Sequence, residues 1–299
     1  MTVLRFADEA CAEVATAGGK GASLARMTSL GLPVPPGFVV HAGALAESLP
    51  DGGDELLRAA REERVRAPEL VSAAEIAHEL RSAVAEAYAE LGDGDHAVAV
   101  RSSACAEDSQ EASFAGQQET YLHVRGASEV LDRVRDCWAS FFSERALFYR
   151  EQRGSLDDLG MAVVVQRMVD ADVAGVLFTM DPVQRRRDRM VVESVFGLGE
   201  AVVSGQVTPD HFVLARDGTV KRERLAVQPL AVVSGSEGGT VERELSPDEG
   251  GTASLGADEL RELARIGAEL EEKLGGPQDI EWALEGGELY VLQCRPVTA

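Results

Sequence analysis

Residues 99–120, AVRSSACAEDSQEASFAGQQET, place one arginine, Arg101, directly before two serines, Ser102 and Ser103. The segment is too polar for a core strand and holds too many Ser, Ala and Gly residues for a stable surface helix. It offers hydroxyl groups, backbone N–H groups and one fixed positive charge, which together can hold a phosphate. We therefore predict that this segment contacts an anion.

The end of the chain, QDIEWALEGGELYVLQCRPVT, reads as a hairpin with residues 285–287 as a three-residue loop. In that register Glu281 faces Val291 and Asp279 faces Gln293. Strand alternation then gives one apolar face and one polar face. The apolar face carries Ile280, Trp282, Leu284, Tyr290, Leu292 and Cys294, and the polar face carries Asp279, Glu281, Gln293 and Arg295.

The polar face of this hairpin has two possible interpretations. Two carboxylates and an amide oxygen suit Mg²⁺, which binds carboxylates together with substrate phosphates. Arg295 beside them could hold a phosphoryl oxygen. The alternative is a salt-bridged face exposed to solvent, and the hairpin taken alone favours that alternative because such faces are common.

Lys20 is a third cation that stands out by its context, GGKGASL. It does not lie in a Walker A loop, because Gly21 stands where Ser or Thr should follow the lysine. Taken alone, Lys20 could be a flexible surface lysine. GLGEAVV, residues 197–203, lacks the third glycine of a dinucleotide fingerprint. Taken together, Lys20, Arg101, Arg295 and the acidic hairpin are suited to a triphosphate held with magnesium.

Hydrophobic periodicity predicts the elements that position these residues. We expect a short helix from about residue 22, helical structure over 54–91 with a break near Pro68, and a buried strand over 96–100. A helical region over 127–154 and strands between 161 and 196 follow. The last expected helix has an apolar stripe of Leu260, Leu263, Ile266, Leu270 and Leu274. The arginine-rich residues 185–189 are expected to cap an exposed hairpin. This mixed order of helices and strands favours an α+β fold.

The composition narrows the class of protein. The 299 residues include 51 acidic and 29 basic ones, for a formal net charge of -22, so nucleic acid and anionic membranes are not expected as partners. Four scattered cysteines form no C-x-x-C pair, and the N-terminus has no signal-peptide pattern. We expect a cytoplasmic protein with reduced thiols.

The chain resembles the N-terminal nucleotide-binding domain of phosphoenolpyruvate synthase, pyruvate phosphate dikinase and rifampin phosphotransferase. Seven collinear motifs carry the resemblance: GGKGASL, GLPVPPGFVV, the segment 99–120, VQRMV, GVLFTMDP, GLGEAVVSG and PQDIEWAL…LYVLQCRP. The resemblance implies an ATP-grasp fold of two lobes with the nucleotide between them. We place the N-terminal lobe at residues 1–167 and the C-terminal lobe at 168–299, as one ATP-grasp unit.

The resemblance also implies a role for each matching residue, with ATP and Mg²⁺ as cofactors. Lys20, Arg101 and Arg295 would act on the phosphates, with residues 102–118 closing over them as a lid. Glu281 and Gln293 would bind magnesium. The residues expected to contact ATP are Lys20, Arg101, Ser102, Ser103, Gly116, Gln117, Gln166, Met168, Val169, Asp279 and Arg295; of these, Gln166 to Val169 would form the hinge strand whose backbone reads adenine.

One departure from the family pattern affects the expected activity. Family members carry the transferred group on a histidine in a Thr/Ser-Ser-His type motif, and none of His41, His78, His96, His123 and His211 lies in one. We therefore expect a phosphotransferase component that needs a histidine carrier on another domain or chain and serves an unknown small-molecule acceptor. The alternatives are a free-standing ATP-grasp kinase acting directly on a small molecule, and a non-catalytic ATP-binding module.

Overall fold

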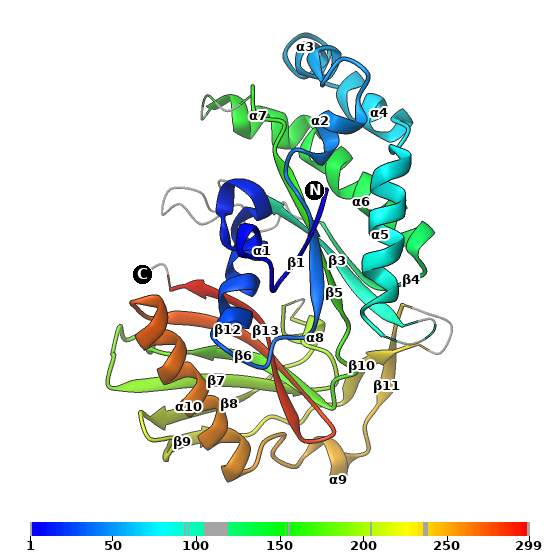
Figure 1. The fold of residues 1–299 in the computed structure, drawn as a ribbon. Coiled ribbons are helices and arrows are strands. Elements are labelled where there is room, and N and C mark those ends of the chain that lie inside the picture. The colour runs from blue at the N-terminus through cyan, green and yellow to red at the C-terminus, as the bar shows by residue number, and fades with distance from the viewer. Residues whose placement is uncertain are drawn as a thin grey trace. The chain divides into compact units, whose positions relative to one another are not determined.

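A computed structural model describes residues 2–92, 94, 96–104, 119–152, 154, 156–203, 205–235 and 239–297. Their contacts divide the chain into two compact units (Figure 1). The first comprises Met1–Leu30 and Pro36–Met168, and the second comprises Gly31–Pro35 and Val169–Ala299. The short segment Gly31–Pro35 joins the second unit because the Pro33 carbonyl accepts a hydrogen bond from the backbone N–H of Val291 at 2.8 Å.

The first unit is built on a five-stranded antiparallel sheet. Its strands are, in spatial order, β1 (Val3–Arg5), β2 (Gly37–Val40), β5 (Met161–Arg167), β3 (Ala97–Ala104) and β4 (Thr120–Arg125). The inner strands β2, β5 and β3 are largely buried runs of Val and Ala. Such strands are typical of a sheet that is covered on both faces.

Helices cover both faces of this sheet (Figure 1). Helix α6 packs on β3, β4 and β5, on the face that carries Val98, Val100 and Val165, whereas α1 packs against β5 and β3 from the opposite face. The helices of this unit are η1 (Glu9–Ala12), α1 (Val14–Ser29), α2 (Ala44–Ser48), α3 (Asp54–Glu62), α4 (Arg66–Ala73), α5 (His78–Ala89), α6 (Ala127–Phe141) and α7 (Glu144–Gln152).

Two helix predictions in this unit were wrong in detail. The helical region is broken at residues 63–65 and again at 74–77, and Pro68 itself lies in the first turn of α4. A proline is tolerated there because the first N–H groups of a helix have no partner within it. The helix expected from about residue 22 starts earlier: its longer segment begins directly after the kink at Gly18, and one helical turn from Val14 precedes that kink.

The second unit contains a six-stranded antiparallel sheet and a two-stranded one formed by β10 (Leu230–Ser234) and β11 (Thr240–Glu244). The larger sheet contains, in spatial order, β13 (Glu288–Pro296), β12 (Gln278–Glu285), β6 (Val173–Phe178), β7 (Arg189–Phe196), β8 (Asp210–Ala215) and β9 (Val220–Arg224). The helices are α8 (Glu200–Val203), α9 (Pro247–Gly250) and α10 (Ala257–Leu274).

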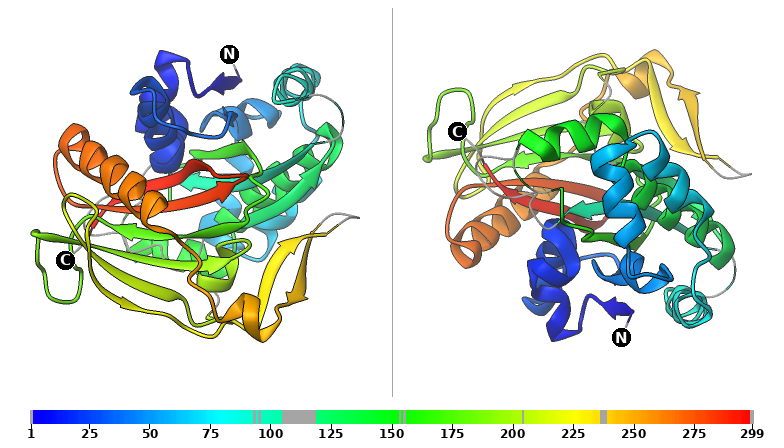
Figure 2. Two further views of the ribbon diagram at one scale, coloured as in Figure 1. Left: turned by 90° about the horizontal axis from the view of Figure 1, so that it is seen from below. Right: turned by 90° about the horizontal axis from the view of Figure 1, so that it is seen from above.

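Helix α10 lies along one face of the six-stranded sheet, against β12 and β6 (Figure 2). Its predicted apolar stripe is confirmed, since Leu260, Leu263, Ile266 and Leu270 are buried and Leu274 is half-buried. A Cβ at Gly267 would lie 2.8 Å from Leu177 of β6, so the helix approaches the sheet closely at this glycine. The opposite face of β12 is therefore the one available to the polar residues of the terminal hairpin.

The predicted α+β class is confirmed, since helices and strands are mixed along the chain in both units. The arginine-rich loop between β6 and β7 is exposed at Arg185, Arg186 and Arg187, as predicted, and Arg186 pairs with Asp188 at 2.6 Å. Within the described ranges, no helix combines the length and the apolar character needed to cross a bilayer.

Candidate functional site

The terminal hairpin of β12 and β13 places four predicted site residues on one face. Glu281 pairs directly with Gln293, and Asp279 pairs directly with Arg295. Directly opposed side chains in an antiparallel pair have Cβ atoms about 4.5–5.5 Å apart and point to the same side of the sheet. The carboxylate of Glu281 and the amide of Gln293 are thus neighbours, each half-buried.

The register of this hairpin differs from the predicted one in two ways. The loop has two residues, Gly286 and Gly287, with φ of 58° and 84°, the positive values that a tight type I′ turn requires. A β-bulge then shifts the pairing between Glu281 and Trp282, so that Trp282 pairs with Val291 while Glu281 pairs with Gln293. The predicted pairs of Glu281 with Val291 and of Asp279 with Gln293 were therefore wrong.

The bulge decides which side chains reach each face. Val291, paired with Trp282, is fully buried, whereas Tyr290 and Leu292 are only half-buried and do not complete the apolar face as predicted. The extra residue in β13 is Leu292. If the ladder continued from the two-residue turn without the bulge, Leu292 would pair with Glu281 and Gln293 with Ile280. Gln293 would then lie on the α10 side, because a shift of one residue exchanges the faces of a strand.

Asp279 and Arg295 form an ion pair in which two guanidinium nitrogens contact one carboxylate oxygen. Arg295 donates from Nε to Oδ2 of Asp279 at 2.8 Å, and its Nη2 lies 2.8 Å from the same oxygen. Burial raises the pKa of Asp279, the positive charge and hydrogen bond of Arg295 oppose that shift, and the nearby Glu281 adds to it. Asp279 thereby holds the guanidinium in place beside Glu281 and Gln293, and about half of the Arg295 side chain is exposed.

The donor set of the hairpin fits a magnesium ion. Among the described residues no group of three or more His, Cys, Asp and Glu side chains is arranged to hold a metal. Mg²⁺ is usually held by one or two carboxylates together with waters and substrate phosphates rather than by a complete protein cage. One carboxylate and one amide oxygen, Glu281 and Gln293, match that requirement.

In the first unit, Lys20 and Arg101 are brought close through strand β3. Lys20, on α1, donates from its ammonium to the carbonyl of Ser102 at 3.0 Å, and Ser102 follows Arg101 in the strand. Thr120 of β4 pairs directly with Arg101, on the same face, and is exposed. Thr120 was not predicted as a site residue, although it is the last residue of the segment 99–120 that is predicted to contact an anion.

The two serines after Arg101 lie on opposite faces of β3. Ser103 shares the Arg101 face, by strand alternation, and Ser102 points to the other face, where it is 1% exposed. The Ser102 hydroxyl donates to the carbonyl of Glu119 at 3.4 Å. The Ser103 hydroxyl is fully buried and already both donates and accepts a hydrogen bond with α1.

The predicted hinge strand lies at the end of β5. Gln166 is 3% exposed and is paired with both Gly37 and Ala99. The N–H of Met168 donates to the carbonyl of Ala97 at 3.0 Å, so that donor is already used within the first unit. The chain passes from the first unit to the second between Met168 and Val169. Gly116 and Gln117, with most of the predicted lid, lie outside the described residues.

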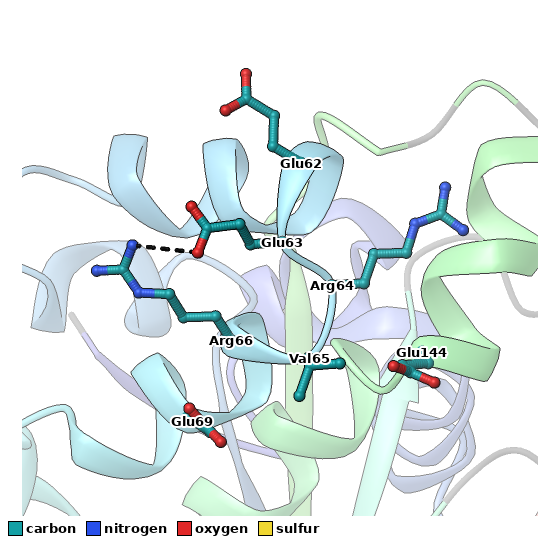
Figure 3. A pocket seen from close by; sticks show the side chains of 7 residues that line it. All are labelled: Glu62, Glu63, Arg64, Val65, Arg66, Glu69 and Glu144. Atoms are coloured by element: carbon teal, nitrogen blue, oxygen red, sulfur yellow. Dashed lines mark ion pairs between the residues drawn. The ribbon is translucent and has the colours of Figure 1, made fainter.

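A surface depression of about 510 Å³ in the first unit contains none of these residues (Figure 3). It is lined by residues 62–66, Glu69 and Glu144, and the ion pair of Arg66 with Glu63 spans 3.7 Å on its wall. Its lining contains four glutamates and two arginines, so the local charge disfavours a phosphate ligand. This depression is not a candidate nucleotide site.

Comparison with known proteins adds the decisive observation. A model of the family described as "Pyruvate phosphate dikinase, AMP/ATP-binding domain" matches residues 14–299. The chain belongs to this family. The match to the pyruvate phosphate dikinase AMP/ATP-binding domain includes Lys20, strand β3 and the whole β12–β13 hairpin.

Named relatives of this family cover nearly all of the chain. It is 41% identical to a probable phosphoenolpyruvate synthase of Methanocaldococcus jannaschii, over 96% of this chain and 26% of that protein. It is 42% identical to a probable phosphoenolpyruvate synthase of Methanothermobacter thermautotrophicus, over 96% of this chain and 44% of that protein. It is also 37% identical to the rifampicin phosphotransferase of Bacillus cereus, over 99% of this chain and 36% of that protein. The chain thus spans less than half the length of these relatives.

Proposed function

We propose that this chain binds ATP with Mg²⁺ and passes a phosphoryl or pyrophosphoryl group to a histidine carried on another domain or chain. The observation that carries the proposal is the single face of the terminal hairpin, where Glu281 opposes Gln293 and Asp279 opposes Arg295. A solvent-exposed charged face would not require the bulge that brings Gln293 to this side. Membership of the AMP/ATP-binding family supports the same conclusion.

Phosphoryl transfer depends on alignment and on neutralising charge more than on a covalent nucleophile in the protein. In the proposed roles, Glu281 and Gln293 hold the metal ion, which neutralises phosphate oxygens when bound. Arg295, oriented by Asp279, contacts a terminal phosphate oxygen. Lys20 and Arg101 contact the phosphate chain, and the backbone of residues 166–169 contacts adenine.

The proposal is tested by incubating the purified chain with β-³²P-ATP, Mg²⁺ and a fractionated extract of its source organism. We expect label on a protein that is lost in acid and stable in base, as a phosphohistidine is. Label found only in the small-molecule fraction would refute the carrier and indicate a free-standing kinase. ATP binding with no transfer to any fraction would indicate a non-catalytic module.

A matched pair of variants controls this assay. Glu281→Ala should abolish Mg²⁺-dependent labelling, whereas Glu288→Ala should leave it unchanged, because Glu288 is exposed at the turn end of the same hairpin. Equal labelling by the two variants would contradict the assignment of the metal site.

A further inference from the structure

Helix α1 is interrupted at Gly18, which has φ 68° and ψ 176° and separates a first helical turn from the longer segment that carries Lys20. The hydroxyl of Ser103, from strand β3, lies in this kink. It donates to the carbonyl of Ala17 at 3.0 Å and accepts from the N–H of Gly21 at 3.2 Å. One serine side chain therefore joins the last residue before the kink to the first turn after it.

Both hydrogen bonds satisfy groups that the kink would otherwise leave without partners. Gly21 lies in the first turn of the second segment, where backbone N–H groups have no acceptor within the helix. Ser103 supplies that acceptor from another element and is fully buried while doing so. A buried N–H or carbonyl without a partner is costly, so the hydroxyl holds the two segments in this arrangement.

Gly18 shows how close the two elements come. A Cβ at this position would lie 2.2 Å from the carbonyl oxygen of Ser103 and 2.3 Å from its hydroxyl oxygen. The positive φ and this contact both require glycine. The joint between α1 and β3 is thus defined from both sides, by Gly18 on the helix and by Ser103 on the strand.

Lys20 lies between Gly18 and Gly21 in helix α1. Its ammonium reaches the carbonyl of Ser102, the neighbour of Ser103. The backbone of Lys20 is set by the Ser103 hydroxyl, and its side chain is directed to the same strand, next to Arg101. A lysine has a long stem with many rotamers, so fixing its two ends lowers the entropy lost when it contacts a ligand.

We propose that Ser103 is a positioning residue, which orients Lys20 relative to Arg101 for the phosphate chain and does not itself contact the nucleotide. The proposal rests on the phosphate role proposed above for Lys20. It replaces the expectation that Ser103 binds ATP directly, because its only O–H proton is already donated to Ala17.

The test compares dissociation constants for ATP and for adenosine, measured by titration calorimetry and by competition. Ser103→Ala should weaken ATP binding about tenfold, by analogy with the hydrogen-bond partners of metal ligands, whose removal costs about 10–100-fold in affinity. Adenosine has no phosphates, so its affinity should change less than about twofold. Ser194→Ala, which removes another fully buried serine hydroxyl, bonded to Ser254 in the second unit, is the matched control and should change neither constant.

A double-mutant cycle separates positioning from a general structural effect. In a Lys20→Ala background, Ser103→Ala should cause no further loss of ATP affinity. If Ser103→Ala does not fold, Ser103→Cys gives the same comparison, because the somewhat larger thiol fills the position of the hydroxyl and forms only weak hydrogen bonds.

Three results would overturn the inference, and they are distinguishable. Equal losses for ATP and adenosine would indicate a structural role only. A loss in the Lys20→Ala background as large as in the native chain would show that Ser103 does not act through Lys20. Unchanged ATP affinity in Lys20→Ala itself would refute the phosphate role of the lysine, and both proposals would fail with it.

Discussion

Trp282 and Glu281 are adjacent in strand β12 and point to opposite faces, so exchanging each for alanine should separate stability from function. Trp282 lies on the α10 side and is 1% exposed, and Glu281 lies on the polar side and is half-buried. We predict that Trp282→Ala lowers the stability of the fold, whereas Glu281→Ala lowers Mg²⁺-dependent ATP binding with little effect on folding.

The magnitude for Trp282 follows from its burial and its hydrogen bonding. Truncating a buried tryptophan to alanine typically costs about 3–5 kcal/mol. Its indole Nε1 is buried and makes no hydrogen bond within the described part of the chain, so the truncation also removes an unsatisfied donor. Such a donor carries a penalty of about 1–3 kcal/mol. Subtracting the midpoint of this range from the midpoint of the truncation cost gives an expected net loss of about 2 kcal/mol.

For Glu281 the expected stability change is within about 0.5 kcal/mol, as for most substitutions away from the core. The affinity for Mg-ATP should fall by more than about 100-fold, because removing groups that only orient metal ligands already costs about 10–100-fold. Urea unfolding followed by far-UV circular dichroism measures the first quantity, and titration calorimetry with and without Mg²⁺ measures the second.

The reasoning would be refuted if Trp282→Ala cost less than about 1 kcal/mol, since the side chain would then not be a core residue. It would equally be refuted if Glu281→Ala unfolded the protein or left Mg-ATP affinity unchanged. A small cost for Trp282→Ala or unfolding of Glu281→Ala would mean that the faces of β12 are assigned incorrectly. Unchanged Mg-ATP affinity in Glu281→Ala would refute the metal role of Glu281.

Three further predictions concern other parts of the chain. Lys20→Ala should weaken ATP binding by about tenfold or more, because a hydrogen bond to a charged group contributes about 1.5–3 kcal/mol; unaltered binding in a calorimetric titration would count against its role. Gly197→Ala should lower the midpoint of urea unfolding, since φ is 77° and a Cβ would lie 2.2 Å from the carbonyl oxygen of Val232; an unchanged midpoint would contradict that contact. Burial raises the pKa of the Cys11 and Cys137 thiols to about 12. In the native protein at pH 8, both thiols should therefore be alkylated at least about 100-fold more slowly than an unperturbed cysteine. Mass spectrometry of the labelled peptides measures these alkylation rates.

Much of the fold could be predicted from local patterns. The apolar stripe of α10 and the alternation in β12 depend on residues close in sequence, so they identify the buried faces without any tertiary information. The same alternation placed Asp279 and Glu281 together on a polar face, and the motifs in their order along the chain predicted the family. These features are local, and neighbouring residues are sufficient to specify them.

The errors arose where distant segments decide the geometry. The bulge at Leu292 was not predictable from the hairpin's own letters, because β12 is paired on its other edge with β6, and its register must satisfy both partners. The kink of α1 required a strand more than 80 residues away to supply the Ser103 hydroxyl, at a sequence separation of 86 from Ala17.

The amino-acid sequence by itself therefore determined which chemical groups this protein has and which face of each element carries them. Only the tertiary structure decided which of those groups meet. It paired Glu281 with Gln293 and Asp279 with Arg295, directed Lys20 to the carbonyl of Ser102, and engaged Ser103 in helix α1. The physical reason is that periodicity is set by the local backbone, whereas register and hydrogen-bond partners are chosen by packing between segments far apart in the chain.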